Sequence, residues 1–290
     1  MNRQGQIIRA LSGFYTVYDG KESIVCKARG KFRKNGQTPL VGDCCEFSYD
    51  GQNEGWITKL YPRHNMLVRP PVANIDQALI VVSAKEPDFS TILLDRFLAL
   101  VEHADITPII IVTKTDLIDK QVLQKMIEPY QVAGYHLILT NPKDKASHEA
   151  IQALFKGKLS VFTGQSGVGK STLLNAISPA LDLKTGVISN VLGRGKHTTR
   201  HVELFELYGG WVADTPGFSS LNLDFSEREL AVAYHDFKTL SQACKFRGCL
   251  HLSEPECAVK QAVKDGHISE ERYAHYQMFL DEIRQKKGKF

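Results

Sequence analysis

The pattern of hydrophobic and polar positions divides the chain into three regions of different texture. In residues 1–68, short apolar runs alternate with glycines, and no run has a helical period. Five short strands that are separated by turns fit a small β-barrel, and the oligonucleotide-binding (OB) type fits better than an SH3-like barrel. The strands are predicted at residues 6–11, 14–18, 23–28, 43–49 and 55–61.

The second region, residues 69–225, alternates continuous apolar runs with amphipathic segments. Such alternation indicates a parallel sheet that is covered by helices on both faces. Ligands of such sheets bind at the carboxyl ends of the strands. The predicted strands are 77–82, 109–112, 135–139, 159–163 and 211–213, and the predicted helices are 91–103, 121–130, 145–155 and a helix from 172.

A glycine-rich loop follows the strand predicted at residues 159–163 and precedes a helix. In a phosphate-binding loop of this pattern, glycines let backbone N–H groups turn toward phosphates, Lys170 reaches the β- and γ-phosphates, and Ser171 places its hydroxyl on Mg²⁺. The alternative is a glycine turn with a surface lysine, and the flanking strand and helix argue against it. The predicted phosphate loop comprises Gly164, Gln165, Ser166, Gly167, Val168, Gly169, Lys170, Ser171 and Thr172.

A second motif, Thr113-Lys114-Thr115-Asp116, follows the strand predicted at 109–112. Its place in the chain puts it at the same sheet edge as the phosphate loop. A carboxylate there accepts hydrogen bonds from the N1–H and the exocyclic amine of guanine, and the stem of Lys114 can cover the ring. Lys-x-Asp after a strand also occurs as an ordinary helix start. Next to a phosphate loop, it predicts a guanine site with Asp116 as the selective group.

Two further segments have the chemistry of a nucleotide switch. Asp214-Thr215-Pro216-Gly217 follows the strand at 211–213. Asp214 can hold Mg²⁺ through water, and Gly217 can direct its N–H at the γ-phosphate. Residues 182–201 are poor in secondary-structure signal, and Thr198 and Thr199 within them are candidates for the second hydroxyl on Mg²⁺. A flexible segment of this kind is expected of a nucleotide switch.

Four potential metal ligands, Cys244, Cys249, His251 and Cys257, follow the spacing C-x4-C-x-H-x5-C. Three thiolates and one imidazole form a closed tetrahedral set for Zn²⁺, which is typical of structural sites. The alternative is that these thiols pack in a small core, but the residues around them are loop-like and offer little apolar burial. Helices are predicted nearby at 256–265 and 269–286. We therefore predict a C-terminal helical domain with one structural Zn²⁺. The remaining cysteines, Cys26, Cys44 and Cys45, lack such partners and are interpreted as barrel thiols.

The composition and charge of the chain predict where the protein is located and what class of molecule it binds. The chain has 43% apolar and 23% charged residues, no window approaches twenty apolar residues, and its first residues contain no apolar signal core. We therefore expect no membrane segment and a cytoplasmic location. Residues 1–70 hold 11 Lys and Arg against 6 Asp and Glu. Such a basic region suggests a polyanionic partner, with a solvated basic face as the alternative.

The loop at 29–36 contains the highest local density of this positive charge. Four cations surround Phe32 there, and such a surface can follow a nucleic-acid backbone while the ring stacks on a base. A mobile charged hairpin is the alternative. The four cations are Arg29, Lys31, Arg33 and Lys34.

Together, these motifs resemble the circularly permuted GTPases of small-ribosomal-subunit biogenesis, the RsgA family, also called YjeQ or YloQ. In ordinary small GTPases the phosphate loop comes first, whereas here the guanine motif precedes it. The resemblance covers the whole chain. It implies an OB-fold domain at 1–68, a circularly permuted P-loop GTPase domain at 69–225 and a helical zinc-binding domain at 226–290. It also implies a GTP hydrolase that acts in late maturation of the 30S subunit, binds 16S rRNA and is stimulated by that particle. We expect a monomer.

Three positions depart from the usual GTPase pattern or are left open by it. Thr113 stands where the guanine motif usually has Asn, so the hydroxyl offers fewer hydrogen-bonding sites. The base-backing motif is only loosely represented by residues 139–141, and none of them is assigned a role. Phe218 stands where many GTPases have a water-orienting Gln, so slow intrinsic hydrolysis is expected.

The residue that orients the water and the overall function both have alternatives. His197 is the candidate for orienting water, and contact with rRNA or solvent is its alternative role. Within the family pattern, Thr199 is preferred to Thr198 as the Mg²⁺ ligand. The rival functions are an ATPase or small-molecule kinase, and an RNA-binding assembly factor in which the nucleotide is merely structural.

Overall fold

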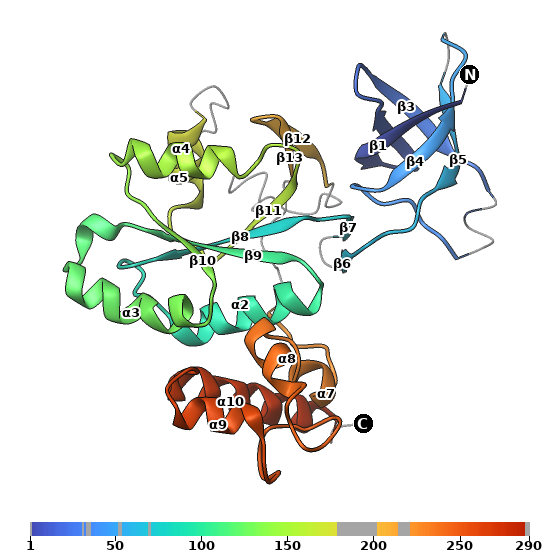
Figure 1. Ribbon diagram of the computed structural model, residues 1–290. Helices are drawn as coiled ribbons and strands as arrows, with labels where there is room; N and C mark the ends of the chain where they lie inside the picture. The colour runs from blue at the N-terminus through green and yellow to red at the C-terminus, as the bar shows by residue number, and fades with distance from the viewer. Residues whose placement is uncertain are drawn as a thin grey trace. The chain divides into compact units, whose positions relative to one another are not determined.

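The computed structural model describes residues 2–30, 32, 36–51, 54–68, 71–178, 202–213 and 221–287 (Figure 1). The contacts between residues divide the chain into two compact units. One comprises Met1–Gln77, Ala150–Phe162 and Ser178–Ser219, and the other comprises Ala78–Glu149, Thr163–Ile177 and Ser220–Phe290. These units group segments by contact, so the domain limits expected from the sequence remain predictions.

The first five strands form a closed barrel, as predicted, with the order β1-β2-β3-β5-β4. All neighbouring strands are antiparallel except the parallel pair β3 and β5. Side chains at alternate positions fill the interior, including the fully buried Val17, Cys26, Phe47 and Ile57. The strands are β1 (Asn2–Leu11), β2 (Phe14–Tyr18), β3 (Ser23–Ala28), β4 (Cys44–Ser48) and β5 (Gly55–Leu60).

The segment after the barrel contains a short antiparallel hairpin, β6 (Met66–Val68) and β7 (Pro71–Ala73). Arg63, just before it, donates from Nε to the buried carboxylate of Asp43 at 2.6 Å. This ion pair fixes the start of the connector to the barrel.

The predicted nucleotide motifs lie on a six-stranded sheet with the order β10-β9-β8-β11-β13-β12. β9 runs parallel to β10, and β11 runs parallel to β13, as predicted. The edge strand β12 is an addition to the prediction, and it runs antiparallel to β13 because a tight turn at Tyr208-Gly209 joins the two. The strands are β8 (Gln77–Ser83), β9 (Thr107–Thr113), β10 (His136–Leu139), β11 (Leu159–Thr163), β12 (Leu204–Leu207) and β13 (Gly210–Ala213).

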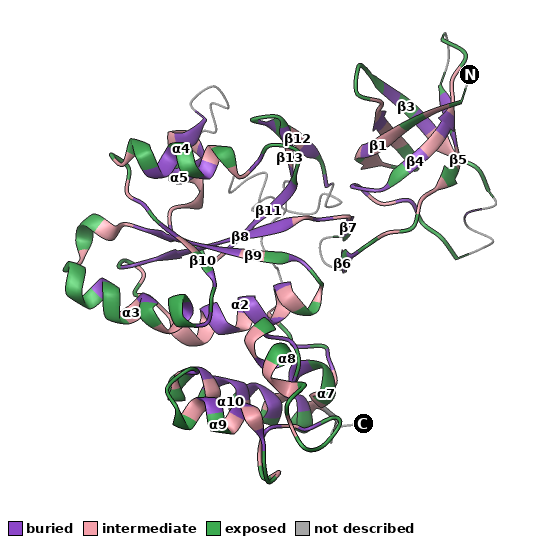
Figure 2. Ribbon diagram, viewed as in Figure 1, coloured by how far each residue is buried: buried purple, intermediate pink, exposed green. Residues whose placement is uncertain are grey.

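Helices cover both faces of strands β8, β9 and β10. α2 (Thr91–His103) and α3 (Lys120–Val132) lie on one face, and α5 (Lys170–Ile177) lies on the other (Figure 1). α4 (Lys145–Ala153) follows β10. Every residue of β8 and β11 is buried (Figure 2), which is the pattern of strands covered on both faces.

Between residues 221 and 287, which the structure describes, lie four helices: α7 (Glu227–Leu230), α8 (His235–Ser241), α9 (Ala258–Lys264) and α10 (Glu270–Lys287). α7 begins with a reciprocal capping box between Ser226 and Glu229. α8 and α10 pack through the buried rings of Phe237 and Tyr276, whose centres are 5.2 Å apart. In the described ranges, no helix has both the length and the apolar character needed to cross a membrane.

Candidate nucleotide-binding site and metal centre

The phosphate loop occupies the turn between β11 and α5, where the sequence predicted it. Gly164 has a φ of +140°, and a Cβ at this position would overlap the carbonyl oxygen of Val81. Only glycine allows the backbone to pass this close to β8 in that conformation. The first glycine of the motif therefore fixes the start of the loop against the sheet.

Lys170, the first residue of α5, folds back over its own loop. Its Nζ donates to the carbonyl oxygens of Gly164 and Gln165, both at 2.7 Å. Burial lowers the pKa of Lys170 to about 8, because a partly desolvated ammonium loses hydration that two neutral carbonyls do not replace. An anionic group at the loop would restore that charge stabilisation. The geometry therefore favours a phosphate ligand.

Thr113 connects the guanine motif to the phosphate loop. It is buried at the end of β9, and its Oγ1 lies 2.5 Å from the carbonyl oxygen of Val168 and 3.2 Å from that of Val82. A hydroxyl has one hydrogen to donate, and the shorter distance assigns it to Val168. The hydroxyl therefore has fewer bonding sites than the usual Asn, as expected, yet it keeps one bond to the phosphate loop.

Lys114 makes a second connection to the same loop. Its Nζ donates to the carbonyl oxygen of Gly167 at 3.0 Å and also to that of Glu86. Its backbone is left-handed, with a φ of 55°, and the short helical turn Thr115–Leu117 starts directly after it. Asp116, in that turn, is exposed. The first two residues of the motif thus hold the phosphate loop, and Asp116 is left accessible to a base edge.

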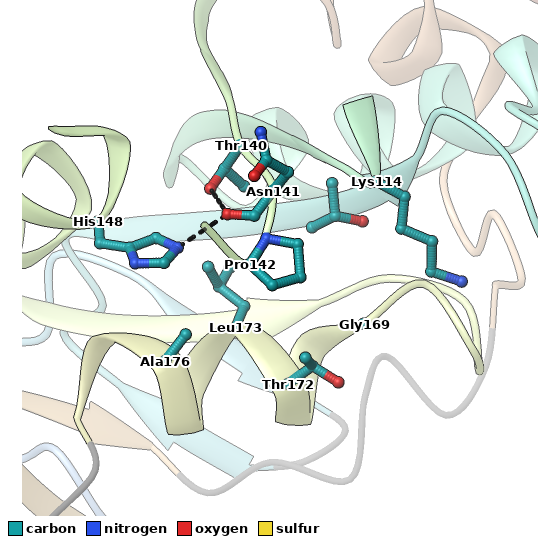
Figure 3. Close-up of a pocket in the computed structure, with 10 residues that line it drawn as sticks. Lys114, Thr140, Asn141, Pro142, His148, Gly169, Thr172, Leu173 and Ala176 are labelled. Carbon is teal, nitrogen blue, oxygen red and sulfur yellow. Dashed lines mark hydrogen bonds between the residues drawn. The ribbon is translucent and has the colours of Figure 1, made fainter. Parts of the chain in front are cut away.

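A cavity of about 100 Å³ lies beside these residues at the carboxyl end of the strands (Figure 3). The loop after β10 forms one side of it, and the first turns of α5 form another. Its walls are largely aliphatic or backbone, which suits a planar ring whose polar edge is read elsewhere. Asp116 lies outside this lining. The lining residues are Thr113, Lys114, Thr140, Asn141, Pro142, His148, Gly169, Thr172, Leu173 and Ala176.

The loop after β10 and His148 are the parts of this cavity that the sequence did not assign. The hydroxyls of Ser147 of α4 and Thr140 are hydrogen-bonded at 2.7 Å, and Nε2 of His148 lies 3.1 Å from the carbonyl oxygen of Asn141. A carbonyl only accepts, so Nε2 carries a hydrogen. Two side chains of α4 therefore hold the cavity wall in place. The position of residues 140–142 after a strand was an available signal, whereas nothing in the sequence distinguishes His148.

The four predicted metal ligands converge. One ligand atom from each of Cys244, Cys249, His251 and Cys257 lies within 4.8 Å of all the others. The sulfurs of Cys244 and Cys257 are 3.9 Å apart. Tetrahedral Zn²⁺ with bonds of about 2.3 Å places two sulfurs about 3.8 Å apart. The separation fits a metal site and is far too long for a disulfide.

The surroundings of His251 select the nitrogen that would bind a metal. Its Nε2 lies 3.1 Å from the carbonyl oxygen of Ala231, so this nitrogen carries the hydrogen. Nδ1 then carries the lone pair, and it points to the sulfur of Cys257 at 3.3 Å. Burial lowers the pKa of His251, which keeps the ring neutral as a ligand must be. The same burial raises the pKa of Cys249 to about 12, so a bound cation is needed to hold this sulfur as a thiolate.

Several predicted site residues lie outside the described residues. These are the candidates His197, Thr198 and Thr199, the motif residues Asp214 and Gly217, position Phe218, and Lys31, Arg33 and Lys34 of the basic loop. Ser171, the other predicted Mg²⁺ ligand, lies in the first turn of α5 and is partly buried.

Comparisons with known proteins agree with this architecture. The family model "RsgA N-terminal domain" matches residues 4–57, and the model "RsgA GTPase" matches residues 60–224. The "Small ribosomal subunit biogenesis GTPase RsgA" of Bacillus subtilis is 54% identical to this chain, and that of a Geobacillus species is 53% identical, each over 99% of both chains.

Two solved structures share the fold. "The crystal structure of YloQ, a circularly permuted GTPase" superimposes with a TM-score of 0.84 at 49% identity, covering 99% of this chain and 96% of that one. YjeQ from Thermotoga maritima superimposes with a TM-score of 0.83 at 37% identity, covering 98% of this chain and 99% of that one. With its barrel, permuted motif order and cysteine cluster, the chain belongs to the RsgA GTPase family and is a GTP hydrolase.

Proposed function

We propose that this chain binds GTP through the guanine motif and the phosphate loop, hydrolyses it to GDP and phosphate, and acts in late maturation of the 30S ribosomal subunit. The observation that carries the proposal is the pair of connections from Thr113 and Lys114 to the phosphate loop, which join a base-selecting motif and a phosphate-binding motif in one site. The names of the relatives supply the ribosomal role.

The reaction is phosphoryl transfer to water, so the residues act by position and charge. Backbone N–H groups of the loop and Lys170 face the phosphates and stabilise the charge that develops there. The hydroxyls of Ser171 and Thr199 would hold Mg²⁺, Asp214 would contact it through water, and Gly217 would offer its N–H to the γ-phosphate. Mg²⁺ supplies further neutralisation of phosphate charge. Loss of the γ-phosphate would remove the partner of the Gly217 N–H, which makes hydrolysis a conformational signal.

His197 is our candidate for orienting the attacking water, since Phe218 occupies the usual position of a glutamine. A histidine side chain titrates near neutrality and can exchange protons with a water beside the γ-phosphate when the protein is bound to the particle. The test is His197→Ala, assayed separately for GTP binding, 30S binding and 30S-stimulated turnover. Loss of turnover alone supports this role, and preserved stimulated turnover excludes it.

The C-terminal cluster serves structure in this proposal. Zn²⁺ would be held by Cys244, Cys249, Cys257 and Nδ1 of His251, a closed set that leaves no position for a substrate. The domain limits 1–68, 69–225 and 226–290, the monomeric state and the cytoplasmic location belong to the same proposal.

The barrel provides contact with 16S rRNA through the basic loop that begins at Arg29. Charge reversal at Arg29, Lys31, Arg33 and Lys34 should weaken association with the 30S particle and reduce its salt dependence, because fewer counterions are released. An unchanged salt dependence of binding would mean that this loop is a solvated surface without contact to rRNA.

The decisive experiment for the function is turnover of GTP with and without purified 30S particles. We expect slow turnover that the particle accelerates, with ATP a poor competitor. Equal competition by ATP would favour the ATPase or kinase alternative. Binding to the particle without any acceleration would favour an assembly factor whose nucleotide is structural.

A further inference from the structure

Three side chains on neighbouring strands of the barrel form a continuous row on its outer surface. Phe14 of β2 lies opposite Lys27 of β3, and Lys27 lies opposite Trp56 of β5. Directly opposed residues project from the same face of a sheet. The adjacent residues Cys26 and Ile57 are fully buried in the barrel, so this row faces outward. We call these three residues the aromatic row.

The aromatic row leaves two large rings accessible. Phe14 is 39% exposed and Trp56 is 45% exposed. Nζ of Lys27 lies 5.0 Å from the centre of the Phe14 ring, and the strand register places Lys27 between Phe14 and Trp56 in the row. Single exposed apolar residues are common on proteins, but contiguous ones usually mark a binding surface. Val25, two residues before Lys27 on β3, extends the exposed apolar area.

Each residue of the row lies within two residues of a connection between strands. Phe14 follows the β1–β2 turn, Trp56 follows the β4–β5 connection, and Lys27 is two residues before Arg29, where the basic loop starts. In OB-type barrels, the β1–β2 and β4–β5 connections and the nearby face of strands 2 and 3 form the surface that binds oligonucleotides. The aromatic row is therefore adjacent in sequence to each segment that would guide such a ligand.

We propose that the aromatic row stacks unpaired bases of a single-stranded RNA segment, with Phe14 and Trp56 as the stacking rings and Lys27 and Arg29 as contacts to its backbone. The proposal rests on the proposed function, in which the partner contains ribosomal RNA, and it adds the surface and the single-stranded form of the target. Every base has a π-face, so stacking of this kind is tolerant of sequence. A cation flanked by two rings suits a ligand that alternates phosphates with aromatic bases better than it suits an apolar peptide.

The carboxylate of Glu54 competes with RNA for Lys27, so the ion pair between them must break when RNA binds. Lys27 forms an ion pair with Glu54 at 2.5 Å, and both side chains are exposed by more than a third. Exposed pairs of this kind contribute about 0–1 kcal/mol. An RNA phosphate can replace the Glu54 carboxylate as the partner of Lys27. Removing Glu54, as in Glu54→Gln, should therefore tighten RNA binding.

Trp56 provides a direct reporter of the surface. The chain has two tryptophans, so Trp211→Phe leaves Trp56 as the sole one. Titration with a single-stranded RNA of about ten nucleotides, within the site size of OB-type barrels, should quench its fluorescence to saturation. The same sequence in a duplex should quench it far less, because its bases are already stacked. Equal quenching by the duplex, or none by either RNA, overturns the proposal.

Variants then separate stacking from simple apolar packing. Binding of a fluorescent RNA, followed by anisotropy, should weaken by about 5- to 150-fold in Trp56→Leu and in Phe14→Leu, the range that corresponds to one lost base stack. Leucine keeps apolar bulk, and urea unfolding of the barrel checks that each variant is folded. Trp56→Phe should keep most of the affinity. The matched control is Phe246→Leu, since Phe246 is 46% exposed in the C-terminal region. Equal losses in Phe246→Leu and Trp56→Leu contradict a specific role of the row.

The ribosomal particle distinguishes failure of this inference from failure of the proposed function. Trp56→Leu should bind the 30S particle more weakly and hydrolyse GTP in isolation at the wild-type rate. If Trp56→Leu binds both RNA and particle as wild type does, the aromatic row has no such role and the proposed function stands. If particle binding falls while no single-stranded RNA reaches Trp56, the row contacts protein and the proposal is wrong. A wild-type chain that ignores the particle refutes the proposed function, while the RNA titration still decides the row.

Discussion

The nucleotide site and the cysteine cluster bring their functional groups together in opposite ways. All four ligands of the cluster come from residues 244–257, a single stretch of chain. The nucleotide site combines the segments 113–116, 140–148 and 164–176, which only the order of strands in the sheet brings together. A metal bound by the cluster would organise the residues around it, whereas the nucleotide site depends on the fold of the whole sheet. Damage to one should leave the other largely intact.

The C-terminal region has a second anchor that is independent of the cluster. Arg272 of α10 is 3% exposed, and its guanidinium donates to Asp236 at 2.7 Å and to Asp95 of α2 at 3.4 Å. Nδ1 of His275 lies 2.6 Å from the other oxygen of Asp95. Three tyrosine rings, Tyr130, Tyr135 and Tyr234, surround the guanidinium at 5.3–5.7 Å. This buried network attaches α10 to a helix of the sheet.

Loss of the metal is the change with the largest expected effect. Cys249→Ala, or removal of Zn²⁺ by a chelator, should unfold much of the chain after residue 226, because structural zinc contributes on the order of 10 kcal/mol. Hydrogen exchange should show this loss while the affinity for GDP stays close to that of the wild type. Cys44→Ala, at an exposed barrel cysteine, is the matched control. Absence of stoichiometric zinc in protein purified without chelator would refute the assignment.

Breaking the second anchor should be the next largest effect. Arg272→Met leaves two carboxylates, Asp95 and Asp236, without their buried counter-charge, and such changes cost about 3–5 kcal/mol. Arg284→Met removes an exposed pair with Glu227 and should cost at most about 1 kcal/mol. Urea unfolding of both variants measures the difference. Equal losses of stability would show that burial of the Arg272 network has no special weight.

These two anchors also show what can be predicted from the sequence. The residues of the cysteine cluster all lie within one short stretch of chain, and so do those of the phosphate loop. In each case the spacing of residues in the sequence is enough to predict the geometry. Asp95 and Arg272 are 177 positions apart, and neither has a local pattern that distinguishes it from an ordinary helix residue. The ion pair between Asp95 and Arg272 can be identified only from the structure, in which α10 packs on α2.

The nucleotide site falls between these extremes. The two motifs and their shared sheet edge follow from strand order, since carboxyl ends of parallel strands meet at one edge. The cavity wall at Thr140, Asn141 and Pro142 depends on hydrogen bonds with two side chains of α4, and its sequence matches no fixed pattern closely enough. The hydrogen bond from Thr113 to Val168 could not be predicted from the sequence either, because a threonine at a strand end usually indicates only β-propensity.

The nucleotide site should respond to pH through Lys170. Its pKa of about 8 in the free site should rise when phosphates bind, because they stabilise the charged form. Below pH 8 the lysine is charged in both states and affinity is constant. Above pH 8, binding takes up a proton, so the affinity for GDP should fall by up to about tenfold per pH unit. Calorimetry in two buffers counts the proton. Lys170→Arg, which stays charged, should lose this dependence, and an identical profile in both proteins would contradict the prediction.

The smallest expected effect concerns the bond between Thr113 and the phosphate loop. Thr113→Val keeps the shape and removes the hydroxyl, so the Val168 carbonyl loses one hydrogen bond worth about 0.5–1.5 kcal/mol. GDP should bind about 2- to 12-fold more weakly, and Thr113→Ser should restore most of the loss. Unchanged affinity in Thr113→Val would show that this connection does not support nucleotide binding.

The central claim is that the strand-end motif and the phosphate loop form one guanine-selective site, and Asp116→Asn tests it most directly. GTP, ATP and xanthosine triphosphate compete for the site against labelled GDP in the wild type and in the variant. In the wild type, GTP should displace GDP far better than ATP does. In Asp116→Asn, preference should shift from GTP to the xanthosine nucleotide, because the amide donates where the carboxylate accepted. Wild-type affinity for GTP in the variant, or equal displacement by GTP and ATP in the wild type, would contradict the account.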